Sequence, residues 1–304
     1  MKKIICILGP TASGKSNLAI NLAKKYDLQI ISVDSVMIYK DFNIGTSKPS
    51  KEILSDIKHR LIDIKKPSEN YSTSEFIKNL YQELDKIYLK NKIPLLVGGS
   101  MQYFNAFFQG GLSDIGTIDL TIRKKLENDL ENYGLDEMYK KLSKIDNDII
   151  KNIHQNDKYR ILKMLEIYFT TGDRPSRIFN ESKKKELDFN FLKIAFLTEN
   201  RQVLHNLISD RMNFMLENNF IEEVSSIRNI YGNVRPLASI GYKQAIEYLD
   251  NKSDFDNMKN KILYATRQLA KRQLTWIRHM HGLTVHMNND SVSIDNRVED
   301  YLNK

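Results

Sequence analysis

One stretch near the N-terminus decides the fold: Ile4-Ile5-Cys6-Ile7-Leu8-Gly9-Pro10-Thr11-Ala12-Ser13-Gly14-Lys15-Ser16. Residues 4–8 are all apolar, which predicts a strand buried on both faces of a parallel sheet. Residues 9–16 fit the pattern Gly-x4-Gly-Lys-Ser/Thr, a phosphate-binding loop that joins a strand to a helix. The sequence therefore begins with the strand, loop and helix start of an α/β protein.

The loop is suited to phosphate by its backbone and by its side chains. Glycines let the chain curl so that N–H groups point at phosphate oxygens. The helix N-terminus and Lys15 add positive charge, and the Ser16 hydroxyl can ligate Mg²⁺. We therefore expect a phosphate compound to bind here, although the loop by itself does not distinguish ATP or GTP from an isoprenyl diphosphate.

Strand and helix patterns alternate before and after a long helical stretch. We predict helices at residues 16–25 and from a capping box at Ser72 and Glu75 to about residue 91. Further strands are predicted at residues 29–33, 93–97 and 191–197, but none between residue 113 and about residue 190. The fold class is therefore α/β: a P-loop NTPase-like, mostly parallel sheet core (residues 1–113 and 191–304) with an all-helical insertion domain (residues 114–190).

Composition sets the expected class of partner and compartment. The 304 residues carry a formal charge of +8, which favours a polyanionic partner. The insertion carries equal numbers of basic and acidic side chains, so any role in binding nucleic acid must depend on local placement of charge. The single cysteine cannot form an internal disulfide, and no apolar run approaches the roughly 18 residues of a transmembrane helix. We expect a cytoplasmic protein that does not enter a membrane.

Polar residues follow the second and third predicted strands. Ligands of open α/β sheets bind at the carboxyl ends of the strands, so Asp34 and Ser100 should both face the phosphate loop. Position alone leaves three roles open for Asp34: a Mg²⁺ ligand, a general base, or the cap of a turn.

From this point several motifs resemble, in order, those of the bacterial tRNA dimethylallyltransferases. Besides the phosphate loop, they are Asp34-Ser35-Val36-Met37-Ile38-Tyr39, Ile44-Gly45-Thr46-Ser47-Lys48-Pro49, His59-Arg60-Leu61-Ile62-Asp63, Pro67-Ser68 with Tyr71-Ser72, Gly98-Gly99-Ser100-Met101-Gln102-Tyr103, Asn156-Asp157 with Arg160 and Leu165-Glu166, Gly241-Tyr242-Lys243-Gln244, and Thr266-Arg267-Gln268-Leu269-Ala270-Lys271-Arg272-Gln273 with Thr275-Trp276 and Arg278. The resemblance spans residues 4 to about 280. It implies transfer of dimethylallyl from dimethylallyl diphosphate to N6 of the adenine next to the anticodon of a tRNA, by a P-loop α/β core whose helical insertion holds the anticodon stem-loop.

The resemblance also implies roles for individual residues. Asp34 would be the general base and Ser100 would hydrogen-bond at the reaction centre, while Arg123 and Arg211 would lie near the diphosphate or the reacting nucleotide. The donor diphosphate would be held by Gly9, Pro10, Thr11, Ala12, Ser13, Gly14, Lys15 and Ser16, with Ser16 as ligand of a Mg²⁺ cofactor. The tRNA would be contacted by Asp34, Ser35, Val36, Met37, Ser100, Arg123, Tyr159, Arg160, Ile161, Leu162, Lys163, Ala238, Ser239, Ile240, Gly241, Tyr242, Lys243, Arg267, Lys271, Arg272, Gln273 and Arg278. We expect the protein to be a monomer.

The chain departs from the family pattern at a few places. Ser100 stands where threonine is usual, which keeps the hydroxyl. Met37 stands where many members have glutamine and cannot make that residue's hydrogen bond to a base edge. Lys163 replaces a frequent arginine, so charge is kept without a bidentate fork. No Cys/His zinc pattern follows residue 280, as in the shorter bacterial form.

A basic helix is predicted after Asp256, because no acidic residue occurs between Asp256 and Asp290. At about 100° per residue, Arg267, Lys271 and Arg278 fall within about 40° of one another. The apolar residues of the opposite face are Ile262, Leu269, Trp276 and Met280. We predict that the apolar face packs on the core and that the three cations contact the phosphate backbone of the RNA.

Two other functions use the same loop. A nucleoside or nucleotide kinase needs the loop and Mg²⁺, but it has little use for a basic helix well beyond the insertion. A non-catalytic GTPase-like switch that binds RNA should carry an Asn-Lys-x-Asp motif, which this sequence lacks.

Overall fold

The computed structural model of this chain describes residues 1–111, 120–181 and 187–304. They form two compact units: Met1–Phe108 with Leu187–Lys304, and Gln109–Glu186. The boundary expected after residue 113 lies outside the described residues. The boundary expected after residue 190 falls inside a strand of the first unit, Phe189–Leu197, so the return to the core comes slightly earlier than the sequence indicated.

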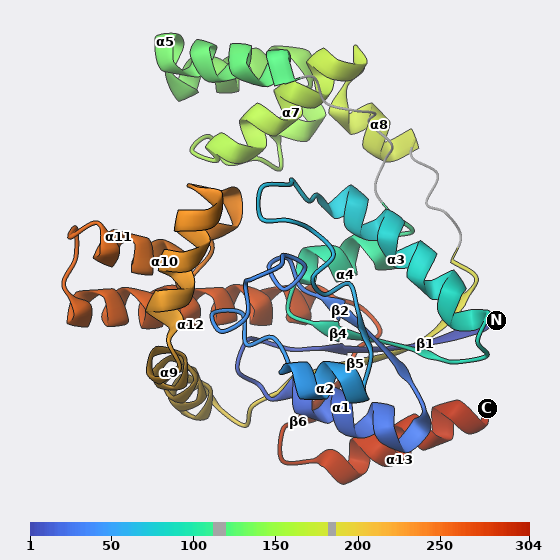
Figure 1. Cartoon of the computed structure of the whole chain (residues 1–304). Helices are drawn as coiled ribbons and strands as arrows, with labels where there is room; N and C mark the ends of the chain where they lie inside the picture. The colour runs from blue at the N-terminus through green and yellow to red at the C-terminus, as the bar shows by residue number, and fades with distance from the viewer. Residues whose placement is uncertain (112–119, 182–186) are drawn as a thin grey trace. The chain divides into compact units, whose positions relative to one another are not determined.

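The first unit is built on a six-stranded sheet in the order β3-β2-β4-β1-β5-β6 (Figure 1). Every pairing is parallel. The strands are β1 (Lys2–Leu8), β2 (Gln29–Val33), β3 (His59–Arg60), β4 (Pro94–Gly98), β5 (Phe189–Leu197) and β6 (Thr284–Met287). The α/β class and the four predicted strands are confirmed. The sequence missed β3, which is only two residues long, and β6, an edge strand that lacks a continuous apolar run.

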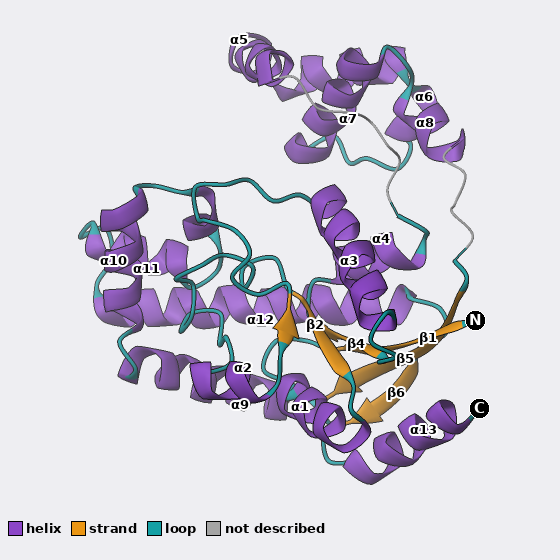
Figure 2. Ribbon diagram, turned by 45° about the vertical axis from the view of Figure 1, so that its right-hand side comes forward, coloured by secondary structure: helices purple, strands orange, loops and turns teal. Residues whose placement is uncertain are grey.

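Helices cover both faces of this sheet, and β1 shows why. Ile5 and Ile7 point to one face, where they join a cluster with residues of α1 (Lys15–Tyr26) and α13 (Ser291–Asn303). Ile4 and Leu8 point to the other face, packed by α3 (Thr73–Tyr88), α4 (Met101–Phe108) and α12 (Phe255–His279). Figure 2 shows α1 and α13 on one side of the strands and α3 and α4 on the other.

Local signals explain where the predicted helices begin. Gly14, at φ 87°, ends the phosphate loop, and α1 follows at once with Leu18 and Leu22 buried. The predicted capping box of α3 is present, since Glu75 N donates to Ser72 Oγ (3.2 Å) and Ser72 N donates to a carboxylate oxygen of Glu75 (3.0 Å).

The remaining helices of the first unit are α2 (Lys51–Asp56), α9 (Arg201–Glu217), α10 (Phe220–Tyr231), the 3₁₀ turn Arg235–Ala238 and α11 (Tyr242–Leu249). Helix α12 packs against both α9 and α11. Tyr242 at the start of α11 packs against Phe42, which follows β2, and against Phe220 at the start of α10, and all three are fully buried. Three segments far apart in the chain therefore meet beside the sheet.

The described residues of the second unit contain helices and no strand: α5 (Leu120–Ile145), α6 (Asn147–Ile150), α7 (Lys158–Thr171) and α8 (Pro175–Glu181). Gly134, at φ 77°, interrupts α5, and Gly172, at φ 74°, ends α7. The unit has its own core, in which Met138 and Leu142 of α5 pack with Ile161 and Leu165 of α7. In neither unit is any described helix both long and apolar enough to cross a membrane.

Candidate active site

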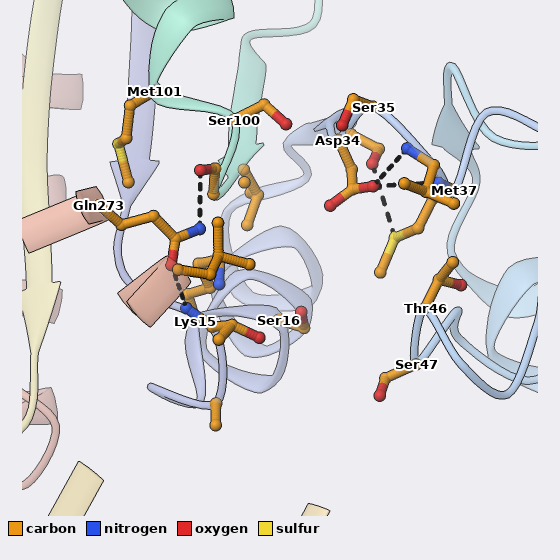
Figure 3. Close-up of a pocket in the computed structure, with 18 of the residues that line it drawn as sticks. Lys15, Ser16, Asp34, Ser35, Met37, Thr46, Ser47, Ser100, Met101 and Gln273 are labelled. Carbon is orange, nitrogen blue, oxygen red and sulfur yellow. Dashed lines mark hydrogen bonds between the residues drawn. The ribbon is translucent and has the colours of Figure 1, made fainter. Parts of the chain in front are cut away.

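A cavity of about 720 Å³ opens at the carboxyl ends of β1, β2 and β4. Its walls include the phosphate loop after β1, residues 34–37 after β2 and residues 99–103 after β4. Figure 3 shows the Asp34 carboxylate and the Ser100 hydroxyl at one end of this space, with Lys15 and Ser16 of the phosphate loop nearby. A cavity therefore lies where the sequence predicted the site, at the carboxyl ends of parallel strands.

Close approach of β2 and β4 brings Asp34 and Ser100 to the same end of the cavity. Gly98 faces Val33 in the parallel register, and a Cβ on Gly98 would lie 2.0 Å from the Val33 carbonyl oxygen. Ser100 N then donates to the same carbonyl (3.3 Å). Only glycine fits between the two strands at this point, so the spacing of the two polar residues depends on it.

The two carboxylate oxygens of Asp34 have different surroundings. Oδ1 accepts hydrogen bonds from Val36 N (2.8 Å) and Met37 N (3.0 Å), which fixes the turn after β2. Oδ2 has no hydrogen-bond partner among the residues that the structure describes, and Asp34 lines the cavity. The capping role left open by the sequence is therefore real, and it leaves one oxygen available to a ligand.

Two cations of the site lack a hydrogen-bonded carboxylate in the described part of the chain. Lys15 Nζ donates to the Pro10 carbonyl (3.0 Å), and Arg211 Nη1 donates to Thr11 Oγ1 (2.6 Å). Burial, followed by the charge of Arg211, lowers the pKa of Lys15 to about 8. Burial also lowers the pKa of Arg211, against the opposing effect of Asp34. Both side chains line the cavity, so it presents positive charge that an anion would neutralise.

The phosphate loop is held from two helices at the same residue. Thr11 receives Arg211 of α9 on its hydroxyl, and Thr11 N donates to Gln273 Oε1 of α12 (2.9 Å). Gln273 Nε2 also donates to the Gly99 carbonyl (2.8 Å), and this pair of bonds is drawn in Figure 3. Gln273 thereby ties the loop after β1 to the turn after β4.

Some residues expected to contact RNA have enclosed side chains. Gln273 is 7% exposed and its amide is committed to Thr11 and Gly99, while Tyr242 is 1% exposed and packs between Phe42 and Phe220. Ile161 is 0% exposed in the core of the helical unit. For Ile161 the structure corrects the expectation, because packing turns this side chain into the core. Gln273 and Tyr242 line the cavity, and their contacts with RNA stay predictions.

The other candidates in the first unit are distributed as follows. Val36, Met37, Ser239, Ile240 and Arg272 line the cavity, as does Ser35, which is exposed. Ala238 and Lys243 are exposed and Gly241 is buried. Ser32 Oγ donates to the Met37 sulfur at 3.9 Å, so Met37 is directed along the end of β2.

Two candidates in the helical unit, Arg123 and Lys163, lie at one buried carboxylate. Glu166 is 4% exposed, receives Lys163 Nζ at 2.8 Å and lies 3.9 Å from Arg123 Nη1. Arg123 also pairs with Glu127 (3.2 Å). Tyr159 and Arg160, at the start of α7, are exposed, whereas Leu162 is partly buried. The roles of Arg123 and of residues 159–163 stay predictions.

The exposed and buried faces of helix α12 differ from those predicted from the sequence. Lys271 and Arg278 are exposed as predicted, but Arg267 is half-buried and lowers the pKa of His205 on α9, an effect second to burial. Trp276 is 40% exposed and, like Leu269, lines the cavity instead of the core. The residues of α12 in the core are Met258, Ile262, Ala270, Gln273 and Ile277. The helix packs against α9 as well as against the core beside the sheet. The contact with α9 turns Arg267 inward.

A divalent cation would find few protein ligands here. The described residues contain no group of three or more His, Cys, Asp or Glu side chains placed to hold a metal. Ser16 is exposed in the cavity beside Lys15, and Asp34 is another oxygen donor in its wall. This set suits Mg²⁺, which commonly takes one or two protein oxygens and completes its shell with phosphate oxygens and water.

Comparison with known proteins agrees with this geometry. A family model described as IPP transferase matches residues 37–280. The chain belongs to the IPP transferase family. A tRNA dimethylallyltransferase of Coxiella burnetii is 41% identical over 302 residues, covering 98% of this chain and 96% of the relative. One of Legionella pneumophila is 43% identical over 284 residues, covering 92% and 90%.

Solved structures of the IPP transferase family have the same fold. The tRNA isopentenylpyrophosphate transferase of Bacillus halodurans aligns with a TM-score of 0.73 at 31% identity, covering 100% of this chain and 97% of its own. A eukaryotic dimethylallyltransferase acting on tRNA aligns with a TM-score of 0.83 at 30% identity, covering 95% of this chain and 75% of its own. The P-loop NTPase-like fold class inferred from the sequence is confirmed.

One contact of this IPP transferase site has no signal in the sequence. The loop after β2 carries Gly45, Thr46 and Ser47 on the cavity wall, and Glu223 of α10 binds that loop from behind. The motif from Ile44 to Pro49 was visible in the sequence, but nothing in it indicated the partner on α10.

Proposed function

We propose that this protein transfers a dimethylallyl group from dimethylallyl diphosphate to N6 of the adenine on the 3′ side of the anticodon in tRNA. One observation carries the proposal: Lys15 and Arg211 share a cavity with Asp34. Among the described residues, neither cation has a hydrogen-bonded carboxylate partner, and one oxygen of Asp34 accepts no hydrogen bond. An anionic leaving group and a proton acceptor are what this alkylation needs.

The reaction follows from these groups. The bond between C1 of the dimethylallyl group and the diphosphate oxygen breaks as N6 of the adenine attacks C1. Lys15, Arg211 and the N–H groups of the phosphate loop stabilise the negative charge that develops on the departing diphosphate. The N6 lone pair is delocalised into the ring, so removal of the N6 proton by Asp34 assists attack. The products are N6-isopentenyladenosine, diphosphate and a protonated Asp34.

Two further parts of the site have proposed roles in the same reaction. The Ser100 hydroxyl would hydrogen-bond at the reaction centre, and the Ser16 hydroxyl would help to hold Mg²⁺. When bound, Mg²⁺ neutralises charge on the leaving group. The adenine must leave its stack to enter the cavity, so the reacting nucleotide is flipped out of the anticodon loop.

The tRNA is held by positive charge around the cavity and on the helical unit. In the first unit Lys271, Arg272 and Arg278 of α12 are exposed, and Arg272 lines the cavity. In the helical unit Arg123, Tyr159, Arg160 and Lys163 would contact the anticodon stem-loop. We propose that the protein acts as a monomer in the cytoplasm, which agrees with its single buried cysteine.

The proposal is tested by incubating the protein with a tRNA, dimethylallyl diphosphate and Mg²⁺, followed by mass spectrometry of the anticodon-loop nucleosides. The expected result is a mass gain of one isopentenyl group on the adenosine next to the anticodon. Reactions lacking the donor, and reactions with ATP in its place, are the controls. Transfer of phosphate from ATP to a small acceptor, with unmodified tRNA, would instead identify a kinase.

A further inference from the structure

Loop 43–48, the segment from Asn43 to Lys48 after β2, forms part of the cavity wall through Gly45, Thr46 and Ser47. It is not part of a helix or strand, so its shape depends on contacts from elsewhere in the chain. One end is held by Lys48, whose Nζ donates to the Tyr39 carbonyl (3.0 Å) and to Asp63 Oδ1 (2.6 Å). The other end, residues 43–45, is held by Glu223 of α10.

The Glu223 carboxylate accepts four hydrogen bonds. Oε2 receives Asn43 N (3.0 Å) and Ile44 N (2.7 Å), and Oε1 receives Gly45 N (3.1 Å). The fourth donor is the Tyr242 hydroxyl, 2.7 Å from Oε1. Three consecutive backbone N–H groups directed at one carboxylate form an anion nest, so this loop is shaped around the negative charge of Glu223.

Packing leaves the loop no freedom at Gly45. A Cβ on Gly45 would lie 2.5 Å from Phe220 Cε2 and 2.5 Å from Tyr242 Cζ. Phe220 and Tyr242 are themselves fully buried, with ring centroids 5.2 Å apart. The residue that donates to Glu223 through its backbone is thus also pressed against the two aromatic rings.

The same residue reaches the phosphate loop through Arg211. Arg211 Nη2 donates to the Gly45 carbonyl at 3.5 Å, and Nη1 donates to Thr11 Oγ1 at 2.6 Å. Tyr242 is close enough to Arg211 for each to shift the pKa of the other, although burial is the largest effect on both. Gly45 and Tyr242, both bound to Glu223, are therefore two of the groups that surround the guanidinium.

We propose that Glu223 is a positioning residue for the donor diphosphate: by binding the Gly45 end of loop 43–48 and the Tyr242 hydroxyl, it sets the place of the Arg211 guanidinium beside the phosphate loop. The inference rests on the proposed function in one respect, the assignment of Arg211 to the diphosphate. Glu223 itself does not line the cavity.

The carboxylate is needed because all four partners are donors. Glutamine has the same shape but only one acceptor oxygen, and its amide NH₂ would face two of the donors. Glu223→Gln should therefore lose two hydrogen bonds to a charged acceptor and shift the loop without removing a side chain from the core. Glu222, its exposed neighbour in sequence, provides the matched control Glu222→Gln.

The first experiment measures pyrophosphate binding by calorimetry, the KM for dimethylallyl diphosphate, and tRNA affinity for the full-length variants. Glu223→Gln is expected to weaken pyrophosphate binding and raise the donor KM by about tenfold, the size of effect of hydrogen bonds to a charged group. tRNA affinity should change by less than about twofold. Unchanged donor affinity in Glu223→Gln, or an equal loss of tRNA affinity, would overturn the inference.

A double-mutant cycle with Arg211→Met then separates positioning from general structure. If Glu223 acts through Arg211, Glu223→Gln should have almost no further effect on pyrophosphate binding once the guanidinium is absent. Full additivity would mean that Glu223 does not act through Arg211. Normal pyrophosphate binding in Arg211→Met alone would refute the role of Arg211 in the proposed function, a result distinct from failure of the Glu223 variant alone.

If Glu223→Gln folds poorly, the variant Tyr242→Phe tests the same inference. It removes one of the four donors and leaves the buried ring in place. A smaller loss of pyrophosphate binding, again absent in the Arg211→Met background, is expected. Unchanged pyrophosphate binding in a folded Tyr242→Phe protein would count against the inference.

Discussion

At the scale of single residues, Asp34 combines a structural and a chemical task on separate oxygens. Oδ1 holds the turn through Val36 N and Met37 N, and Oδ2 faces the cavity without a hydrogen bond from a described residue. Replacement by alanine would remove both tasks and free two backbone donors. Replacement by asparagine keeps an acceptor for the turn, so it isolates the role in proton transfer.

We predict that Asp34→Asn lowers kcat by about 10²- to 10⁴-fold, the usual contribution of a general base. Binding of pyrophosphate and of tRNA should stay within about threefold of the unchanged protein, since cationic contacts supply most of both. Single-turnover kinetics with labelled donor would measure the chemical step. Turnover close to that of the unchanged protein would rule out Asp34 as the base.

Lys15 gives the site a pH dependence. Its pKa is lowered to about 8 in the ligand-free protein, and a bound diphosphate stabilises the protonated amine, which raises that pKa. The contribution of Lys15 to pyrophosphate affinity should therefore be fully present below about pH 8. It should be lost as pH rises through this value, by up to about tenfold per pH unit. Calorimetry from pH 7 to 9.5 measures it, with Lys15→Met giving the background from ionisation of the ligand. An equal dependence of pyrophosphate affinity on pH in the unchanged protein and in Lys15→Met would contradict the prediction.

At the scale of elements, α12 performs different tasks on different faces. Gln273 joins the phosphate loop to the turn after β4, Trp276 lines the cavity, and Lys271 and Arg278 are exposed to solvent. Because α12 also packs against α9, Arg267 is turned toward α9 and is not part of the exposed cationic face. The cations available to an RNA backbone are therefore fewer than the periodicity indicated.

We predict that Lys271→Ala and Arg278→Ala each weaken tRNA binding and reduce the slope of log K against log salt by about one, as for loss of one phosphate contact. Lys90→Ala is the matched control, because Lys90 is exposed shortly before β4, whereas the cavity lies at the other end of that strand. Filter binding between about 50 and 200 mM salt measures the slopes. Slopes indistinguishable from the control would exclude phosphate contacts by α12.

At the scale of the whole molecule, each unit has a hydrophobic core of its own. The sheet of the first unit is covered on both faces, and the helical unit packs around Leu142 and Ile161, both 0% exposed. The phosphate loop, Asp34, Ser100 and Arg211 all belong to the first unit. Loss of packing in the helical unit should therefore leave binding of the diphosphate intact.

We predict that Leu142→Ala destabilises the helical unit by about 2–5 kcal/mol, the usual cost of such a cavity. Hydrogen exchange should accelerate across α5 and α7, while α1 and pyrophosphate affinity are unchanged and tRNA affinity falls. Leu89→Ala, at a position 84% exposed, is the control. Accelerated exchange in α1 would contradict the independence of the two units. Unchanged tRNA affinity would contradict the RNA-binding role of the helical unit.

The sequence by itself determined the features that arise within short segments. Apolar runs marked β1, β2, β4 and β5 because a strand buried on both faces has no polar alternation. The phosphate loop and the capping box of α3 were visible because a few neighbouring residues create them. Asp34 and Ser100 could be placed in one cavity because parallel strands end at the same edge of the sheet.

Tertiary structure alone decided what depends on contacts between distant segments. Glu223 meets the loop at Gly45 across 178 positions, Arg211 meets Thr11 across 200, and Gln273 meets Thr11 across 262. No local pattern carries these pairings, because helix and strand periodicity describes only which face of an element is apolar. The packing of α12 on two neighbours decides which way Arg267 and Trp276 point. Burial in the folded protein lowers the pKa values of Lys15 and Arg211.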